Sequence, residues 1–380
     1  MSLMSRFGFI ILTLVLFTVS STVYADQPWN LPEGVTPLSH AIYHLHMITF
    51  YICCGIGVVV FGALIYSIIK FRRSQGAKAE EIHEHLGLEI LWTIIPFLIL
   101  VGMAIPSTKV LMDIHNTAKP DLDIKVTGFQ WKWKYEYLNQ GISFFSNLST
   151  PLEQINNLQA KDEWFLLEVD KPLVVPVHKK IRFLFTANDV IHSWWVPELG
   201  LKQDAIPGYI NENWTMIEKP GIYRGQCAEL CGSYHGFMPI VVQAVSEEDF
   251  ERWVQNQMQQ TKTTSTHSLT QKELLTVGET AYTKNCAACH QANGQGLPPT
   301  FPPLKANAVV TGDVNHQIKI ILNGVSGTPM QAFANQLDDN TLAAIITYTR
   351  NAWGNAALNT QNKKIVTVEP RDVKAVREKS

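Results

Sequence analysis

The sequence has few charged residues and no excess of charge of either sign. Asp, Glu, Lys and Arg make up 17% of its 380 residues, and the formal net charge is -2. This excludes a broadly basic nucleic-acid binder, so we expect no nucleic acid among its partners. Six cysteines are too few for a disulfide scaffold in a chain of this length. Aromatic residues account for 10% of the chain, which excludes a disordered or collagen-like protein.

The N-terminal 25 residues have the features of an export signal. Arg6 precedes an apolar stretch, and Val23-Tyr24-Ala25 ends with small residues where a signal peptidase cleaves. We therefore predict a cleaved signal peptide over residues 1–25. The alternative is an N-terminal helix that is retained.

Two longer apolar runs follow, at about 47–69 and 86–105. Each is long enough to cross the roughly 30 Å hydrocarbon core of a membrane. Lys and Arg are concentrated between the runs, so the positive-inside rule places this loop in the cytoplasm. We predict a transmembrane hairpin over 40–111, followed by extramembrane domains on the outer side. Glu89 is the one charged residue within the two runs, and it is either functional or solvated at the interface.

The first extramembrane domain covers about residues 121–256. Short β-like runs separated by Pro, Gly and Asn favour a β-sandwich or barrel. A polar, irregular stretch over 138–163 predicts a long loop, and an amphipathic pattern over 247–257 predicts a short helix. The expected strands are 121–130, 164–169, 181–188, 214–218 and 239–245.

Soft metal ligands are concentrated in one short segment of this domain. Cys227, Cys231, His235 and Met238 follow one another at intervals of four, four and three, so one loop can bring them to one centre. This ligand set favours copper, and two thiolates are enough to bridge two copper ions. A second nitrogen ligand is then needed, and His192, which follows a predicted strand, is the candidate. The alternatives are a disulfide and a zinc site, although the methionine argues against zinc.

A second extramembrane domain carries the motif Cys286-Ala-Ala-Cys289-His290. This spacing is typical of c-type haem attachment, in which two thiols add to the haem vinyl groups and the histidine binds the iron. An electron-transfer haem needs a second axial ligand, which is often methionine. Met330 is the only methionine after the motif, and His316 is the competing candidate. The alternative for the cysteines is a thioredoxin-like redox pair.

The surroundings of the haem motif indicate a helical domain over 271–354. Residues 273–285 and 339–353 have helical patterns. The polar stretch at 257–270 predicts a linker. Residues 355–380 have mixed charge, and we expect a mobile polar tail.

These motifs together resemble those of subunit II of haem–copper cytochrome c oxidases with a fused cytochrome c domain, the caa3-type arrangement. The resemblance covers about 40–255 for subunit II and 271–354 for the cytochrome. It implies a transmembrane hairpin, an all-β cupredoxin-like Greek-key sandwich and an all-α class I cytochrome c domain. The motifs are Leu88-Glu89-Ile90-Leu91-Trp92-Thr93, Gln130-Trp131-Lys132-Trp133, Gly200-Leu201-Lys202-Gln203-Asp204 and residues 225–239.

The resemblance also implies a ligand set for a dinuclear copper centre, CuA. Cys227 and Cys231 bridge the ions, His192 and His235 bind one each, and Met238 is a weak ligand. Glu229 contributes its backbone carbonyl to the copper site, and its side chain helps bind a Mg ion at the interface with subunit I.

The implied function is electron transfer in a terminal respiratory oxidase. An external donor, such as a cytochrome c or the bc1 complex, reduces a haem c held by Cys286, Cys289, His290 and Met330. Electrons then pass to CuA and to subunit I, where O2 is reduced to water with proton translocation. Trp131 matches the electron-entry residue of unfused relatives, and Glu89 matches the entrance of a proton pathway.

The implied setting is the bacterial inner membrane, with the soluble domains on the periplasmic side. Subunit I, subunit III and membrane lipid are the expected neighbours. The rival interpretation is a membrane-anchored copper chaperone or thiol-redox assembly factor with a haem domain. Met238, the haem motif and the hairpin anchor favour the oxidase subunit.

Overall fold

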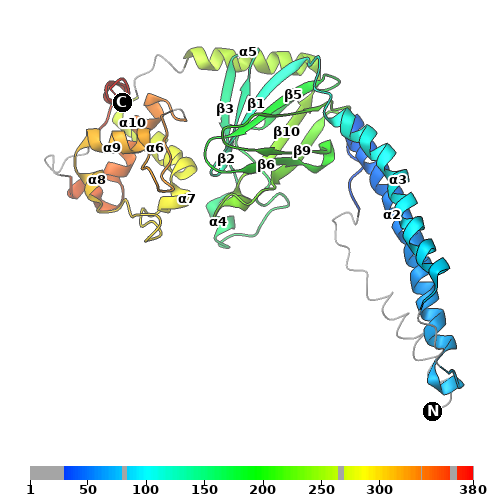
Figure 1. Cartoon of the computed structure of the whole chain (residues 1–380). Coiled ribbons are helices and arrows are strands. Elements are labelled where there is room, and N and C mark those ends of the chain that lie inside the picture. Colours follow the sequence, from blue (N-terminus) through cyan, green and yellow to red (C-terminus); the bar gives the residue numbers. More distant parts are fainter. Residues whose placement is uncertain (1–29, 79–83, 264–268, 335, 360–365, 380) are drawn as a thin grey trace. The chain divides into compact units, whose positions relative to one another are not determined.

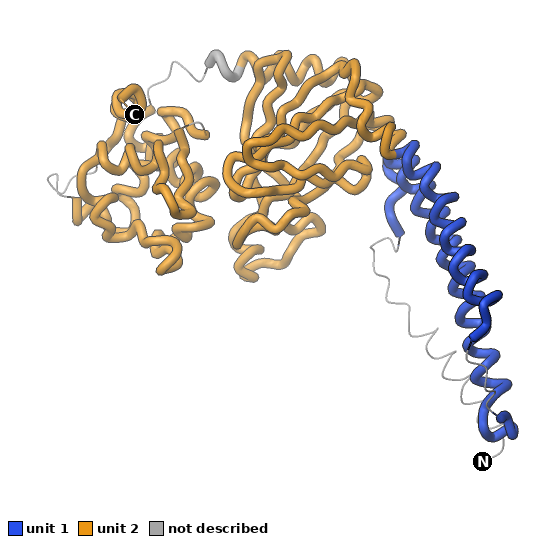
Figure 2. The backbone as a smooth tube through the Cα atoms, viewed as in Figure 1, with its two compact units in different colours: residues 1–34, 39–110 blue, residues 35–38, 111–380 orange. Residues whose placement is uncertain are grey.

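The computed structural model describes residues 30–78, 84–263, 269–334, 336–359 and 366–379 (Figure 1). The predicted signal peptide over 1–25 lies outside these residues. The chain divides into two compact units, shown in Figure 2. One comprises 1–34 and 39–110, and the other comprises 35–38 and 111–380.

The first unit contains two long apolar helices, α2 (Pro37–Lys70) and α3 (Leu86–Ile114). Within the described residues, they are the two helices whose length and composition suit a membrane span. Both extend beyond the predicted apolar runs, α2 at its start and α3 at its end. The reason is that hydropathy marks only the part of a helix that suits lipid, and α2, with 34 residues, is about 51 Å long. The 3-10 helix η1 (Arg73–Gln75) lies in the connecting segment.

The second unit begins with a sandwich of two five-stranded sheets (Figure 1). One sheet has the order β3-β2-β1-β5-β8, and the other has the order β4-β10-β9-β6-β7. The strands of the first sheet are β1 (Leu122–Phe129), β2 (Lys132–Tyr137), β3 (Ile142–Ser146), β5 (Ile181–Ala187) and β8 (Asn211–Thr215). Those of the second are β4 (Leu173–Pro176), β6 (His192–Val196), β7 (Leu201–Ala205), β9 (Gly221–Cys227) and β10 (Pro239–Val245).

These elements confirm the predicted sandwich but correct three of its segments. The strand predicted at 214–218 is β8, which lies at 211–215. The predicted strand at 164–169 is wrong, because only Val169 makes an isolated bridge, to Leu148. The predicted loop at 138–163 is interrupted by β3, whose Ile142 and Phe144 are buried. In β3, buried residues alternate with more exposed ones, as expected for a strand with one buried face. Residues 164–169 are rich in apolar side chains, but no strand among the described residues pairs with them along their length. Short helices α4 (Leu152–Ile155) and η2 (Pro197–Leu199) lie in connections.

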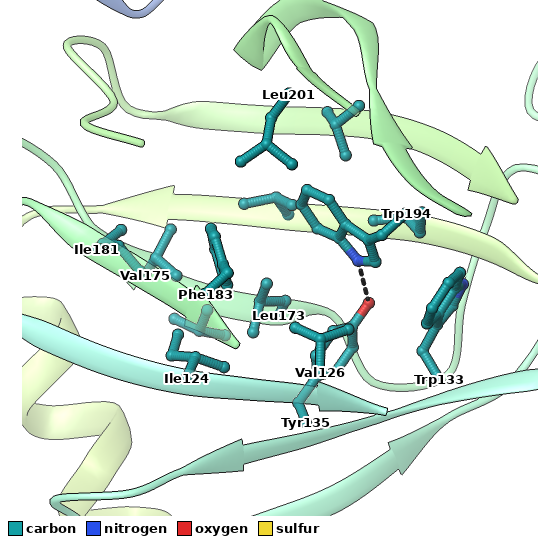
Figure 3. Packing of buried hydrophobic residues seen from close by; sticks show 14 of the residues in the cluster. Ile124, Val126, Trp133, Tyr135, Leu173, Val175, Ile181, Phe183, Trp194 and Leu201 are labelled. Atoms are coloured by element: carbon teal, nitrogen blue, oxygen red, sulfur yellow. Dashed lines mark hydrogen bonds between the residues drawn. The ribbon is translucent and has the colours of Figure 1, made fainter. Parts of the chain in front are cut away.

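The core of the sandwich is built from inward-facing residues of both sheets. Ile181, Phe183 and Phe185 alternate along β5 and are fully buried. Figure 3 shows Trp194 of β6 against this cluster, with its indole N–H donating to the Tyr135 hydroxyl at 3.3 Å. Burial of each large apolar side chain stabilises the fold by about 1.5–3 kcal/mol. The hydrogen bond satisfies the one polar atom that Trp194 carries into the core.

Helix α5 (Glu247–Thr263) closes one end of the sandwich and extends the predicted helix. Phe250 is buried and stacks on Trp253, whose ring also lies 5.1 Å from that of Tyr137. The helix continues six residues beyond the predicted end at 257, into the segment expected to be a linker. Gln and Lys are good helix formers, so a polar segment can continue a helix and is not necessarily a linker.

The remainder of the second unit is a helical domain. It contains α6 (Gln271–Asn285), α7 (Ala287–His290), α8 (Ala308–Thr311), α9 (Val314–Asn323), α10 (Asp339–Asn351), η4 (Ala352–Ala357) and α11 (Pro370–Arg377). Thr270 caps α6 through a capping box with Glu273. Helices α6 and α10 pack closely, because Gly278 has no side chain to separate them and a Cβ there would lie 2.1 Å from the Ala344 carbonyl oxygen.

The expected mobile tail at 355–380 is wrong for its described part. Helix α11 packs on α9 and α10, and Val368 and Val373 are buried there. The segment nevertheless has an apolar face, because Val373 and Val376 are three residues apart and lie on one side of the helix. The charged residues around them made this face hard to recognise from composition.

Candidate metal and haem sites

The predicted copper ligands of the sandwich lie close together. The Sγ atoms of Cys227 and Cys231 are 3.9 Å apart and unbonded. His192 Nδ1 lies 3.9 Å from Cys227 Sγ, and His235 Nδ1 lies 3.5 Å from Cys231 Sγ. Met238 Sδ is 3.5 Å from Cys231 Sγ. Each thiol therefore has its own imidazole, and the thioether lies beside one of them.

The sheet register brings the distant histidine to the cysteine loop. His192 is the first residue of β6, and Cys227 is the last residue of β9. The two strands are antiparallel neighbours with Trp194 opposite Cys227, and the Ala228 N–H donates to the Ser193 carbonyl at 2.9 Å. The chain then turns through η3 (His235–Phe237) into β10. Strand pairing thus joins ligands that are 35 residues apart.

The two cysteines and one histidine of the predicted copper site are buried, and the two cysteine sulfur atoms are close enough to bind the same metal ion. Cys227 and Cys231 are each 3% exposed, and His192 is fully buried. Metal–thiolate bonds are about 2.3 Å long for zinc, so sulfur atoms 3.9 Å apart can bind the same ion. His192, Cys227 and Cys231 form the one group of three or more metal-binding side chains found among the described residues. The residues present therefore fit a thiolate-bridged copper site.

The three buried ligand side chains that titrate differ in their protonation, and only that of Cys227 favours metal binding. The pKa of Cys227 is lowered because Cys231 donates a hydrogen bond to its thiolate, while the pKa of Cys231 is raised because it keeps that proton. Burial opposes the charged form of His192, but hydrogen bonds to Asp189 and Cys227 outweigh it and raise its pKa. Cys227 is therefore the thiol that ionises first, whereas Cys231 and His192 would each have to lose a proton before they could hold a copper ion.

Asp189 and Gly128 support His192, and neither role was predicted from the sequence. Asp189 Oδ1 lies 2.9 Å from His192 Nε2, so the carboxylate orients the ring with Nδ1 toward Cys227. A Cβ at Gly128 would lie 2.7 Å from His192 Cδ2, so only glycine leaves room for the ring. The Asp three residues before the His was a detectable signal. The glycine was not, because β1 and β6 meet only in the tertiary structure.

The side chain of Trp131 contacts the loop that contains Cys231. Its indole N–H donates to the Cys231 carbonyl at 3.2 Å, and its ring centroid lies 5.0 Å from that of Tyr234. Asp189 Oδ2 accepts the backbone N–H of Gln130 at 2.8 Å, so one carboxylate holds both this turn and His192. The predicted electron-entry residue is thus one hydrogen bond from a predicted copper ligand.

The structure places the two predicted glutamates in different settings. The Glu229 carbonyl lies 3.4 Å from Cys227 Sγ, while its side chain is exposed. Glu89 is exposed in the first turn of α3. These positions are compatible with contacts to a neighbouring subunit.

The haem motif forms a compact turn at the end of α6. Cys286 and Cys289 are unbonded, and burial raises their pKa values to about 12 and about 11. His290 Nδ1 lies 2.9 Å from the Pro302 carbonyl oxygen, which acts as acceptor for the N–H and leaves Nε2 for a metal. Burial lowers the pKa of His290, and the neutral ring is the form that binds iron. The residues present therefore fit a covalently attached haem.

The two candidates for the second axial ligand differ in their environment. Met330 lies in the loop between α9 and α10 and packs against the apolar cluster of this domain. His316 is exposed in α9. A haem is mostly apolar, so the packed methionine is the better candidate.

Comparison with known proteins gives three family matches along the chain. The profile described as "Cytochrome C oxidase subunit II, transmembrane domain" matches residues 25–110, and the periplasmic domain of the same subunit matches 122–245. A third, "Cytochrome C oxidase, cbb3-type, subunit III", matches residues 273–348.

Individual relatives cover the first two of these regions. The probable cytochrome c oxidase subunit 2 of Rickettsia conorii is 40% identical over 66% of this chain and 80% of its own length. The Arabidopsis thaliana protein is 38% identical over 66% of this chain and 97% of its own length. The solved periplasmic domain of cytochrome oxidase subunit II from Bradyrhizobium japonicum is 41% identical, covering 38% of this chain and 98% of that one, with a TM-score of 0.34.

Proposed function

Because the chain belongs to the cytochrome c oxidase subunit II family, we propose that it is the electron-entry subunit of a caa3-type terminal oxidase. The protein is part of an oxidase complex, is anchored in a membrane and has a periplasmic domain. Subunit II implies a subunit I partner and a cytochrome c donor. In our proposal, the donor reduces a haem on this chain, and electrons continue through CuA to subunit I.

The observation that carries this proposal is the paired geometry of the copper ligands. Two thiols at 3.9 Å, each with its own imidazole, suit two ions that share both sulfurs. A dinuclear copper centre of this kind supplies one-electron transfer. The chain's contribution is to hold the buried Cys227, Cys231 and His192 together with the partly buried His235 in a fixed frame, so that little rearrangement accompanies a change of charge. Met238 is proposed as a weak ligand and the Glu229 carbonyl as another.

The helical domain supports the fused-cytochrome part of the proposal. Cys286 and Cys289 would form the thioethers, and His290, oriented by the Pro302 carbonyl, would bind the iron. Met330 would be the second axial ligand. Covalent attachment of the two domains replaces a diffusive encounter by an intramolecular one, at an effective concentration on the order of mM. We therefore propose that the haem is the obligatory entry point for electrons.

Further roles concern the neighbours of this subunit. We propose Trp131 as the residue through which electrons enter the copper site, supported by its hydrogen bond to the Cys231 carbonyl. The exposed side chain of Glu229 would help bind Mg at the subunit I interface. Glu89 would stand at a proton-pathway entrance. Subunit III, membrane lipid and the bacterial inner membrane complete the proposed setting.

Metal analysis and EPR of the full chain, produced with haem-maturation factors, test the copper centre. We expect two coppers for each haem iron, with hyperfine structure from both copper nuclei. One copper, or an EPR-silent protein with a Cys227–Cys231 disulfide, would instead support the copper-chaperone interpretation.

Removal of the chain after Thr263 tests the haem as entry point. The oxidase complex with this truncation should retain its copper signal but oxidise the external donor more slowly. Full turnover with soluble cytochrome c would show that electrons enter directly at the copper site. The copper signal serves as the control for folding.

A further inference from the structure

We propose that α11 is a clamp that positions the Met330 loop of the haem domain, with Arg377 as the positioning residue. This inference rests on the proposed role of Met330 as an axial ligand. It assigns a function to the C-terminal segment 366–379, which matches no haem motif and had been expected to be mobile.

The Met330 loop connects α9 to α10 and is tied to α9 at its start. Gly324 opens the loop with φ +69°, and a Cβ there would lie 2.6 Å from the Met330 carbonyl oxygen. The Val325 N–H donates to that carbonyl at 2.9 Å, and the Phe333 N–H donates to the Ile321 carbonyl at 2.9 Å. These bonds fix the first half of the loop.

Arg377 holds the second half of the loop. Its Nη1 donates to the Ala334 carbonyl, and its Nη2 donates to the Leu337 carbonyl at 3.0 Å. Its Nε donates to Asp339 Oδ1 at 2.8 Å, at the first residue of α10. A planar guanidinium presents its donors in a fixed fork, so one side chain sets three acceptors relative to one another.

Apolar packing joins the same helix to the methionine. Val373 is fully buried and Val376 is 7% exposed, both in the cluster that contains Phe333 and Leu322. Met330 packs against this cluster. Without α11, one side of the cluster would be open to water, and the loop would lose its apolar support.

Two pairs of hydrogen bonds anchor the chain that leads into α11. The Thr347 hydroxyl donates to the Val368 carbonyl at 3.3 Å, and the Val368 N–H donates back to that hydroxyl at 3.0 Å. Asn351 Nδ2 donates to the Val366 carbonyl at 2.8 Å, and the Val366 N–H donates to Asn351 Oδ1 at 3.1 Å. The clamp is therefore fixed to α10 at its base and to the loop at its tip.

The expected consequence concerns the bond between methionine and iron. A loop that is free to move must lose conformational freedom each time its methionine binds, whereas a clamped loop has already lost it. Weakening the clamp should therefore increase the fraction of haem without methionine. It should also lower the reduction potential, since methionine ligation raises it.

The test uses the full haem-loaded chain and the variants Arg377→Gln and a deletion of 366–380. The readouts are the far-red absorption band of the ferric iron–methionine bond, the haem potential and the affinity for added imidazole. In R377Q, the band should weaken and imidazole should bind about ten-fold more tightly, the size expected when hydrogen bonds from a charged group are lost. The deletion should have a larger effect.

Arg371→Gln is the matched control, because Arg371 lies on the same helix and is 79% exposed. It should leave the band and the imidazole affinity unchanged. A normal band and affinity in both R377Q and the deletion would overturn the clamp, as would an equal effect in R371Q. If the deletion unfolds the domain, R377Q decides alone. Absence of the band in the unmodified chain would refute Met330 as ligand and this inference with it, while leaving the copper centre untouched.

Discussion

The proposed copper and haem sites of this chain differ in how their residues are brought together. The residues proposed to attach the haem are five consecutive ones, 286–290, at the end of one helix. The proposed copper site joins His192, at the start of one strand, to a loop that begins at Cys227 on a neighbouring strand. A local motif survives changes elsewhere in the fold, whereas a site between strands depends on every element that fixes their register.

The largest expected effect is the selective loss of copper on removing one of the two thiols proposed to bridge the copper ions. In Cys227→Ser, the chain should lose both copper ions and their shared hyperfine pattern, since one sulfur cannot bridge the pair in the same way. Haem content should not change, because the haem cysteines belong to a separate motif. Metal analysis and optical spectroscopy measure both, with Cys53→Ser in α2 as the control thiol. Loss of haem in C227S would show that the two sites are not independent.

A smaller effect is expected from crowding His192. Gly128→Ala places a methyl group 2.7 Å from the imidazole Cδ2, and the required shift should lower the free energy of unfolding by about 1–3 kcal/mol. Copper occupancy should fall as the ring moves, and haem content should stay constant. Gly236→Ala in η3 is the control, because its new Cβ meets nothing within 4 Å. Equal loss of copper in both variants would argue against the steric explanation.

Asp189→Asn should have a moderate effect that is specific to copper. The amide keeps the approximate shape but removes the charge that orients His192 through Nε2. Loss of such a supporting hydrogen bond typically weakens metal affinity by about 10–100-fold. Competition with a copper chelator measures the affinity, and EPR shows whether the two ions remain equivalent. Asp170→Asn is the control, because Asp170 is likewise 14% exposed and accepts a backbone N–H, from Asn147. An unaltered copper affinity in D189N would show that Asp189 does not support the copper site.

The smallest effect concerns the protonation of Cys227 in the chain without copper and haem. The pKa of Cys227 is lowered, so its thiolate should persist at neutral pH and be protonated only as the pH falls well below 7. Cys286 and Cys289 have pKa values raised to about 12 and about 11, so they should stay protonated until strongly alkaline pH. Ultraviolet thiolate absorbance against pH measures this difference. The neutral-pH signal should vanish in C227S and remain in Cys286→Ser, and the reverse pattern would contradict the assignment.

Much of both sites was visible in the sequence because their chemistry is local. Cys227, Cys231, His235 and Met238 are close in sequence, and the haem motif is a contiguous signature. His192 was predicted only because the copper ions needed a second nitrogen ligand. The structure brings it to Cys227 through the pairing of β6 with β9.

The sequence also identified the membrane helices, the sandwich and the helical domain. Long apolar runs, short β-like runs and a helical period are each properties of neighbouring residues, so composition along the chain is sufficient to recognise them. Several strands were missed, including β4, β6, β7 and β9, because none of them alternates apolar and polar residues strongly enough to stand out.

Only the tertiary structure decided what lies beside each ligand. Gly128 is an ordinary glycine in the sequence, and its importance comes from the approach of β1 to His192. Arg377 belongs to a polar segment whose composition predicts mobility, yet its guanidinium bonds to the loop of Met330. The sequence determined which chemical groups are available and which cofactors they suit. The fold determined which of those groups meet, because such contacts depend on strand register and helix packing between residues that are far apart in the chain.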